Sequence, residues 1–299
     1  MNNIAVIITV FNRKEKTLKC LRSLQETLHP HRDRYFVKVF LTDDGCTDGT
    51  AQAIRDGGFE IPVEILAGTG SLYWNGGMIH SWKAALADAV DYDGYLWLND
   101  DSEVLPAFWE DLAAVDAYSL KEYGKRGIYV GSTMDPETGK FTYGGFNYVS
   151  KFSLLDEFVI PDGKTIRECE ACHGNITYVS REVVGSEGIF CEKYIHGAAD
   201  HDYSYLAHKH GFPVLVLPHY SAACENDHIG KKVAAEPKKT SLKERIAAAG
   251  KPTGRNFHNS LLFNRRCFPW RVPIVLLSDG MKILCPGFAH TVYMAFRKK

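Results

Sequence analysis

The residues best suited to chemistry are Asn99-Asp100-Asp101, which directly follow the apolar run Leu96-Trp97-Leu98. Such a run is typical of a buried strand, and open α/β sheets bind ligands just outside the carboxyl ends of their strands. Clustered carboxylates suit a hard divalent cation, which is usually shared with substrate phosphates. Residues 96–103 therefore predict a metal–diphosphate site, although a solvated turn has a similar composition.

Two further acidic pairs are candidates for the same site. Asp43-Asp44 ends a second predicted strand, where a carboxylate can accept hydrogen bonds from a base or from ribose hydroxyls; the alternative is a solvated turn. Asp200 and Asp202 open a predicted helix. They are candidates for a general base and a supporting carboxylate, or for simple capping of that helix.

Three other features of the sequence are weaker indications of a binding or metal site. Gly76-Gly77 would let the backbone approach a phosphate at a helix start, or would form a tight turn. His228 is either a further metal ligand or an exposed loop histidine. Residues 169–173 have the spacing of a haem attachment site, but attachment requires export and no signal is present, so two core or loop cysteines are the preferred interpretation.

The segments that must position these residues alternate between strand and helix. Right-handed βαβ units on a mostly parallel sheet follow from this alternation. The loops 11–13, 42–48 and 99–103 should then lie on one edge of that sheet. The expected strands are 4–10, 36–41, 63–66 and 95–98, and the expected helices are 14–29, 50–56 and 78–89.

The pattern is looser beyond residue 103. We expect a catalytic domain over 1–224, with a nucleotide-binding half over about 1–103 and an acceptor half over about 104–224. Residues 225–299 are expected to form a basic loop and a helical C-terminal appendage. The remaining expected strands are 127–131, 141–149, 175–179 and 214–218, and the remaining helices are 106–120, 181–186 and 199–210.

Composition narrows the class of protein. The 299 residues are 45% hydrophobic and 24% charged with a net charge of −1, so we expect no nucleic-acid partner. No uninterrupted apolar run reaches the roughly 18 residues of a membrane span. Without a secretory signal, the 8 cysteines are expected to be reduced thiols in a cytoplasmic protein.

Taken together and in order, these motifs resemble the inverting nucleotide-sugar glycosyltransferases of family two, which have the GT-A fold. The similarity covers about residues 4–220. The similar segments are residues 7–13, the "DDGCTDGT" motif at 43–50, residues 72–77 (similar to rhamnosyltransferase-like members), 96–101 and 200–202. This sequence departs from the family pattern at three positions: Asn99 replaces the first Asp of the DxD motif, Ala199 replaces the Glu of "EDxD", and Cys224 lies near the place of a common histidine.

The resemblance implies an α/β fold, a Rossmann-like sheet flanked by helices, and specific roles. Asp200 would be the catalytic base with Asp202 in support. Asp101, with His228 as a second candidate, would bind Mg²⁺ or Mn²⁺. The donor nucleotide would be held by Thr9, Phe11, Asn12, Arg13, Asp43, Asp44, Trp74, Gly76, Gly77, Asn99 and Asp100.

The implied reaction moves a sugar from a nucleoside-diphosphate-sugar to a hydroxyl of a saccharide or lipid-linked acceptor, in surface polysaccharide assembly. The rival hypotheses are a nucleotidyltransferase and a non-catalytic sugar-nucleotide or carbohydrate-binding protein. The basic segment 231–251 is either a lid over the phosphates or a solvated linker. Residues 268–299 either contact the inner face of a membrane peripherally or form helices packed on the catalytic domain.

Overall fold

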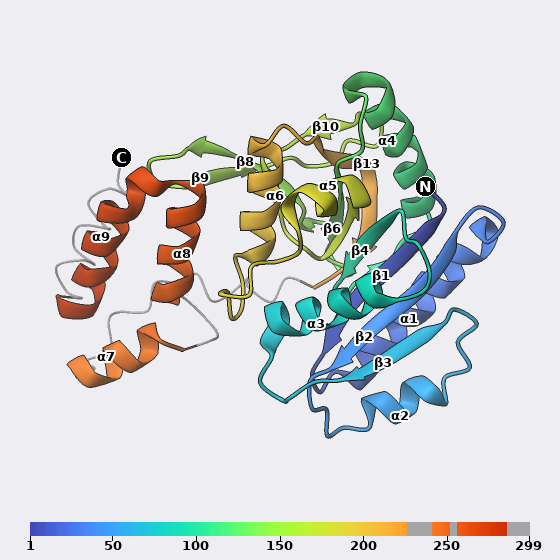
Figure 1. Ribbon diagram of the computed structural model, residues 1–299, viewed down its shortest axis with the longest axis horizontal. Helices are drawn as coiled ribbons and strands as arrows, with labels where there is room; N and C mark the ends of the chain where they lie inside the picture. The colour runs from blue at the N-terminus through green and yellow to red at the C-terminus, as the bar shows by residue number, and fades with distance from the viewer. Residues whose placement is uncertain (226–240, 252–255, 286–299) are drawn as a thin grey trace.

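The computed structural model describes residues 1–225, 241–251 and 256–285. A twisted sheet of 10 strands runs through the centre of the larger part (Figure 1), and a second sheet of 3 strands lies beside it. The main path of the large sheet has the order β10-β13-β6-β12-β4-β1-β2-β3, with β5 on β13 and β7 on β6; the small sheet has the order β11-β8-β9. The strands are β1 (Asn3–Val10), β2 (Phe36–Asp43), β3 (Val63–Ala67), β4 (Gly94–Leu98), β5 (Glu103–Val104), β6 (Ile128–Met134), β7 (Phe141–Tyr143), β8 (Gly145–Ser150), β9 (Leu155–Phe158), β10 (Arg167–Glu168), β11 (Ala171–Cys172), β12 (Ile176–Ser180) and β13 (Val214–Ala223).

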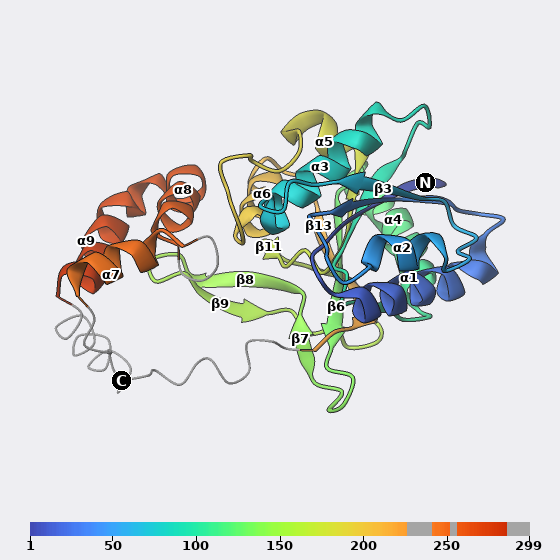
Figure 2. The ribbon, with the colours of Figure 1, turned by 90° about the horizontal axis from the view of Figure 1, so that it is seen from below.

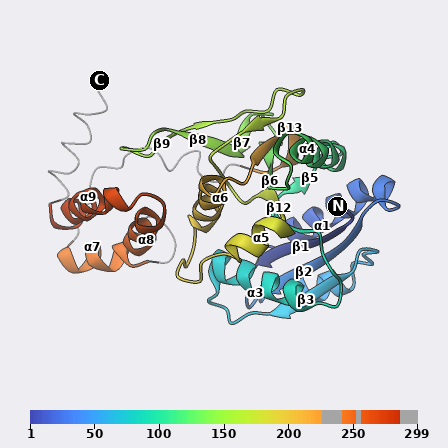
Figure 3. The ribbon, with the colours of Figure 1, turned by 45° about the horizontal axis from the view of Figure 1, so that its top comes forward.

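Helices cover both faces of the large sheet. Figures 2 and 3 show α1, α2 and α4 on one side of it and α3, α5 and α6 on the other. The helices are α1 (Lys14–Leu28), α2 (Thr50–Arg55), α3 (Tyr73–Ala87), α4 (Phe108–Tyr123), α5 (Arg181–Glu187), α6 (Ala199–Lys209), α7 (Leu242–Ala249), α8 (Phe257–Cys267) and α9 (Val272–Leu284), with 3-10 turns η1 (His29–His31) and η2 (Pro269–Arg271).

Side-chain alternation along β1 explains why the sheet has two cores. Ile4, Val6 and Ile8 pack under α1 and α4, whereas Ala5 and Ile7 pack under α3. All five side chains are fully buried. Because successive residues of a strand face opposite sides, a continuous apolar run is what a strand between two helical layers requires.

The expected edge of converging loops is confirmed. β1 pairs in parallel with both β2 and β4, so the turns that follow the three strands leave the sheet at the same end. Val10, the last residue of β1, is level with Asp43, the last residue of β2. The motifs of the first half of the chain are therefore neighbours in space.

β1 to β4 pair in parallel, whereas β12 runs antiparallel to β4 and β6. The structure differs from the sequence expectations at several points. The expected strand 141–149 is divided between β7 and β8, which belong to different sheets. β13 continues past Pro218 to Ala223, with register shifts around the proline, which cannot donate a ladder hydrogen bond. α3 begins at Tyr73, five residues before the expected start at Met78, so Gly76 and Gly77 lie inside the helix.

The C-terminal helices α7, α8 and α9 form a separate cluster beyond α6 and the β8–β9 hairpin (Figure 1). Among the described residues, no helix is both long and apolar enough to cross a bilayer. The cluster packs on the larger part through Phe263 and Phe268, which belong to the same core as Tyr205 of α6, and it is linked to Asp202 of α6 by an ion pair. Both carboxylate oxygens of Asp202 accept hydrogen bonds from Arg266 Nε at 2.9 Å, and Tyr194 Oη donates to Oδ1 at 3.0 Å.

We predict that Arg266→Ala loosens this junction, because it leaves the carboxylate of Asp202 buried without its cation. Asp202 is 1% exposed. Breaking a buried pair by removing one partner typically costs 3–5 kcal/mol; because the Arg266 side chain is 39% exposed, we expect about 2 kcal/mol. Urea unfolding followed by circular dichroism measures the change. Arg265→Ala, the exposed neighbour, is the control, and equal midpoints for the two variants would contradict the prediction.

Candidate active site

Arg13 connects the loop after β1 to the loop after β4. Its Nη1 lies 2.6 Å from Asp101 Oδ2 and 3.4 Å from Asp100 Oδ1. Thr17, one turn into α1, has its hydroxyl 3.5 Å from Asp100 Oδ2. The two carboxylates at the end of β4 are thus held against the first turn of α1.

Asn12 connects the same loop to the motif after β2. Its side-chain oxygen accepts a hydrogen bond from the backbone N–H of Thr47 at 2.7 Å, and its own N–H donates to Cys46 Sγ at 3.2 Å. Asn12 has a φ of 52°, a left-handed conformation that asparagine tolerates better than most residues. Asp48 adds a further contact, since its Oδ2 accepts a hydrogen bond from the N–H of Lys14 at the start of α1.

The two aspartates at the end of β2 have different surroundings. Asp44 is 4% exposed, and its carboxylate accepts backbone hydrogen bonds from Gly70, Leu72 and Tyr73 at 2.8, 2.9 and 3.1 Å. It therefore shapes the glycine-containing segment that leads into α3. Asp43 is partly exposed, and its Oδ1 accepts a hydrogen bond from the N–H of Cys46 at 2.7 Å. Asp43 therefore has more acceptor capacity left for a ligand than Asp44, although Asp44 and not Asp43 lines the cleft between these loops.

The Asp100–Asp101 pair has an excess of negative charge. Burial, and next the charge of Asp101, raise the pKa of Asp100 to about 7. Cys224 donates a weak hydrogen bond from Sγ to Asp101 Oδ1 at 3.7 Å, and burial and Asp101 raise the pKa of this thiol to about 12. The pair thus suits an additional cation, which Arg13 replaces only in part.

Three or more grouped metal-ligating side chains are not found among the described residues. A magnesium-type ion does not need such a group, because it usually binds one or two carboxylates together with substrate phosphates and water. The donor set Asp100 and Asp101 fits that arrangement. The predicted ligand His228 lies outside the described residues.

A tryptophan links the end of β4 to the start of α6. Trp74 Nε1 donates a hydrogen bond to Asn99 Oδ1 at 2.9 Å. The same indole lies against Gly174, where an added Cβ would be 3.1 Å from the ring and 3.3 Å from the Cβ of Asp200. The backbone N–H of Gly174 in turn donates to Asp200 Oδ2 at 2.9 Å. Asp200 is therefore brought next to the donor-side residues through Trp74 and Gly174.

Asp200 and Asp202 point to different parts of the molecule. Asp200 is oriented by the N–H groups of Gly174 and His201, and its side chain is 14% exposed. Asp202 is the buried partner of Arg266 described above. The supporting role of Asp202 in catalysis stays a prediction, and the contacts observed here are those of a residue that anchors α8.

A cleft of about 490 Å³ lies where these loops meet. Four lining residues were not among the predicted site residues, namely Val10, Gly70, Tyr73 and His196, and of these His196 alone lies outside the first half of the chain. Partial burial lowers its pKa; Asp200 acts to raise it and Arg13 to lower it, so the ring lies within electrostatic reach of both sides of the cleft. The lining residues are Thr9, Val10, Phe11, Arg13, Asp44, Gly70, Tyr73, Trp74, Asp100 and His196.

Gly76 and Gly77 serve the packing of α3. A Cβ on Gly77 would overlap with the side chain of Thr9, and one on Gly76 would lie 3.2 Å from Leu72 Cβ. The helix thus approaches β1 closely because Gly77 has no side chain. A role of the pair in binding the donor stays a prediction.

Comparison with known proteins agrees with this arrangement. The family model described as glycosyl transferase family 2 matches residues 5–141, the part of the chain that holds the loops after β1, β2 and β4. No match was found among curated proteins.

Solved structures extend the likeness over nearly the whole chain. A mannosyltransferase, PcManGT from Pyrobaculum calidifontis in complex with GDP-Man and Mn²⁺, is 18% identical with a TM-score of 0.53, covering 98% of this chain and 73% of that one. S. aureus TarS 1-349 in complex with UDP-GlcNAc is 13% identical with a TM-score of 0.56, covering 95% and 80%. GalNAc-T7 with UDP, GalNAc and Mn²⁺ is 14% identical with a TM-score of 0.63, covering 95% and 52%. The fold is therefore of the GT-A type.

We predict that Asp44→Asn destabilises the protein, because an amide nitrogen cannot accept the backbone hydrogen bonds that a carboxylate oxygen accepts. One or two of the N–H groups of residues 70–73 lose their acceptor, at a cost of about 2 kcal/mol. Thermal and urea unfolding measure the change. Asp56→Asn, an exposed residue at the end of α2, removes the same charge as a control. The same small effect for both variants would argue against the structural role of Asp44.

Proposed function

We propose that this protein is a glycosyltransferase that moves a sugar from a nucleoside-diphosphate-sugar to a hydroxyl group with inversion at the anomeric carbon. One observation carries the proposal: Arg13 and Trp74 line one cleft at the carboxyl edge of the sheet, and residues of two further segments lie beside them. Asp101 contacts Arg13 at 2.6 Å, and Asp200 accepts a hydrogen bond from Gly174, which lies against Trp74. Ligands of open α/β sheets bind at this edge.

The donor nucleotide is assigned to the side of the cleft formed by β1 and β2. Phe11 is 55% exposed there and offers an apolar face for a base. Asp43 has a carboxylate oxygen that can accept a hydrogen bond from a base N–H or a ribose hydroxyl. The solved relatives named above contain GDP-Man, UDP-GlcNAc or UDP, which supports the class of donor but not its identity.

The diphosphate is assigned to the space between Arg13 and the carboxylate pair. Asp101 and Asp100 would hold Mg²⁺ or Mn²⁺, and two of the solved relatives contain Mn²⁺. When bound, such a cation neutralises charge on the leaving nucleoside diphosphate. Arg13 would leave Asp101 and donate its N–H groups to phosphate oxygens, for which a guanidinium has the right geometry.

Asp200 would be the general base. Its two N–H partners, on Gly174 and His201, fix the direction of the carboxylate while leaving acceptor capacity for an incoming hydroxyl. As the acceptor oxygen attacks the anomeric carbon from the face opposite the diphosphate, its proton passes to Asp200. A single displacement of this kind inverts the configuration. His196, next to Asp200, is positioned to contact the transferred sugar or the diphosphate.

The acceptor is a saccharide or a lipid-linked saccharide, and surface polysaccharide assembly is the proposed setting. The rhamnosyltransferase-like subtype and a cytoplasmic location with peripheral contact at the inner face of the membrane stay predictions. Apolar side chains exposed on α9 are available for such contact: Leu276, Leu277 and Leu284 are 48%, 69% and 65% exposed. Of the proposed lid, 231–251, residues 231–240 lie outside the described residues, and Leu242–Ala249 form the helix α7 rather than a loop.

We predict that Asp200→Asn lowers turnover by about 10²–10⁴-fold, because the amide cannot take the proton of the acceptor hydroxyl. Donor binding should stay within about twofold of the unchanged protein, since Asp200 lies on the acceptor side of the cleft. Transfer is measured with a panel of acceptors, and donor affinity by calorimetry. Unchanged turnover would show that Asp200 is not the base. Loss of donor binding would show that Asp200 contacts the donor instead.

We predict that a nucleoside diphosphate raises the melting temperature more when Mn²⁺ is present than in EDTA, and that Asp101→Asn abolishes this metal-dependent increase. A bound ligand stabilises the folded state by mass action, so the preferred nucleotide in a screen should give the largest shift. Asp33→Asn, an exposed position after η1, is the charge-matched control. A shift of the same size in Asp101→Asn would contradict the assignment of the cation to this carboxylate.

A further inference from the structure

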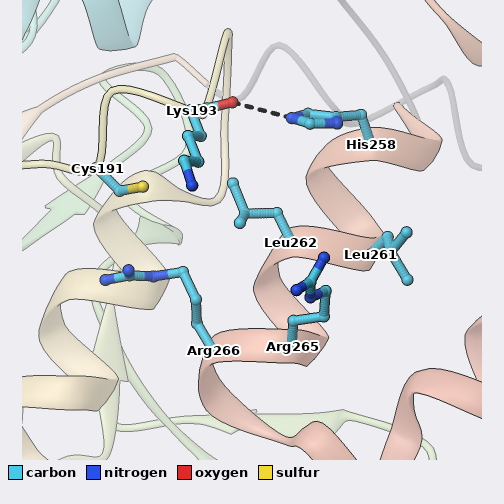
Figure 4. Close-up of a pocket in the computed structure, with 7 residues that line it drawn as sticks. All are labelled: Cys191, Lys193, His258, Leu261, Leu262, Arg265 and Arg266. Atoms are coloured by element: carbon cyan, nitrogen blue, oxygen red, sulfur yellow. Dashed lines mark hydrogen bonds between the residues drawn. The ribbon is translucent and has the colours of Figure 1, made fainter.

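A second cavity lies on the other side of the loop that carries His196. It has a volume of about 470 Å³ and is formed between residues 191–193 and the exposed face of α8 (Figure 4). This cavity is separate from the donor cleft, since the two have no lining residue in common. Its lining residues are Cys191, Lys193, His258, Leu261, Leu262, Arg265 and Arg266.

The cavity is lined by cationic groups and by no carboxylate. The charge of Arg266 is neutralised by Asp202, whose two carboxylate oxygens accept hydrogen bonds from Arg266 Nε. Lys193 and Arg265 have no acidic partner in the part of the chain that the structure describes. In Figure 4 the Lys193 amine and the Arg265 guanidinium both extend towards the space beside Leu262.

The backbone around the cavity is held in place by hydrogen bonds. His258 Nε2 lies 3.2 Å from the carbonyl oxygen of Lys193, and because a carbonyl only accepts, this nitrogen carries the proton. Asn259 Nδ2 donates to the carbonyl of His196 at 2.7 Å. From the opposite side, Asn75 Nδ2 donates to the carbonyls of Cys191 and Tyr194. The loop is therefore a shared wall, with the basic cavity on one side and the donor cleft on the other.

We propose that this basic cavity binds the phosphate or diphosphate group of the acceptor, with Lys193 and Arg265 as its main ligands. The term acceptor rests on the proposed function; the anion site itself does not. Two like charges pointing into one cavity repel each other unless an anion lies between them, and guanidinium and ammonium groups are the usual protein ligands of phosphate. Leu261 and Leu262 form an apolar side to the cavity, which suits a phosphate carried on a lipid as well as one carried on a saccharide.

Binding of pyrophosphate in the presence of EDTA tests the anion site. Chelation removes the cation that the donor cleft needs, so binding at the basic cavity, which needs no metal, is observed alone. Calorimetry should detect binding by the full-length protein, and Lys193→Ala and Arg265→Ala should each weaken it about tenfold, as expected for a lost charge-assisted contact. Both side chains are exposed, so the variants should fold, which circular dichroism checks. Arg22→Ala, an exposed arginine on α1, should leave the affinity unchanged.

The source of the phosphate is tested with vesicles. Phosphatidylcholine vesicles containing phosphatidic acid present a lipid phosphate, and vesicles with phosphatidylserine at matched charge are the control. Selective co-sedimentation with phosphatidic acid that Lys193→Ala and Arg265→Ala abolish indicates a lipid-linked acceptor. Binding of pyrophosphate without vesicle binding supports the site and indicates a phosphate on a water-soluble acceptor. Binding of neither probe, or binding that neither substitution weakens, overturns the proposal.

These outcomes are independent of the proposed function. Metal-dependent nucleotide binding is measured separately and should be unchanged in Arg265→Ala, because the cavity and the donor cleft share no side chain. If nucleotide binding fails while pyrophosphate binding in EDTA persists, the glycosyltransferase assignment is wrong and the anion site stands. If metal-dependent nucleotide binding is found but pyrophosphate does not bind in EDTA, the anion site is wrong and the glycosyltransferase assignment stands.

Discussion

Asp100 and Asp101, at the carboxyl end of β4, are two neighbouring carboxylates that are stabilised by positive charge. The elements around them bring Arg13 to this pair. Asp100 is 6% exposed beside a second carboxylate, and its pKa rises to about 7. Arg13 is the nearest cation, and it reaches the pair only because the turn after β1 lies level with the ends of β2 and β4. The parallel order β4-β1-β2 is thus a condition of the site. A divalent cation would supply the positive charge that Arg13 provides only in part.

Packing explains how distant segments hold these loops in place. Trp97 of β4 lies with its ring centroid 4.4 Å from that of Phe190, and Phe190 in turn lies 5.4 Å from Trp74. Trp82 and Tyr203 close the same aromatic cluster from α3 and α6. The cluster lies beneath the cleft and fixes the distance between its donor side and Asp200. The loop before α6 is held in addition by α8, which connects the C-terminal helices to the site.

The sequence predicted which loops meet, but not where each side chain points. The ends of parallel neighbouring strands must share an edge, so the positions of Arg13, Asp43 and Asp101 followed from the strand pattern. Asp44 was grouped with Asp43, yet its carboxylate is occupied by three backbone N–H groups of a segment 26–29 residues away. Asp202 was paired with Asp200, but Arg266, from a helix beyond the expected domain boundary, holds its carboxylate. His196 belongs to no motif, and only the tertiary path of its loop places it in the cleft.

The central claim is that the three strand-end loops bind a divalent cation together with a nucleoside diphosphate. A crystal of the protein grown with Mn²⁺ and the preferred nucleoside diphosphate tests it through the anomalous signal of manganese. We expect a single strong peak within coordination distance of a carboxylate oxygen of Asp101 and next to the diphosphate, and a nucleoside beside Phe11 and Asp43. A manganese ion or a nucleotide bound away from the ends of β1, β2 and β4 would contradict it.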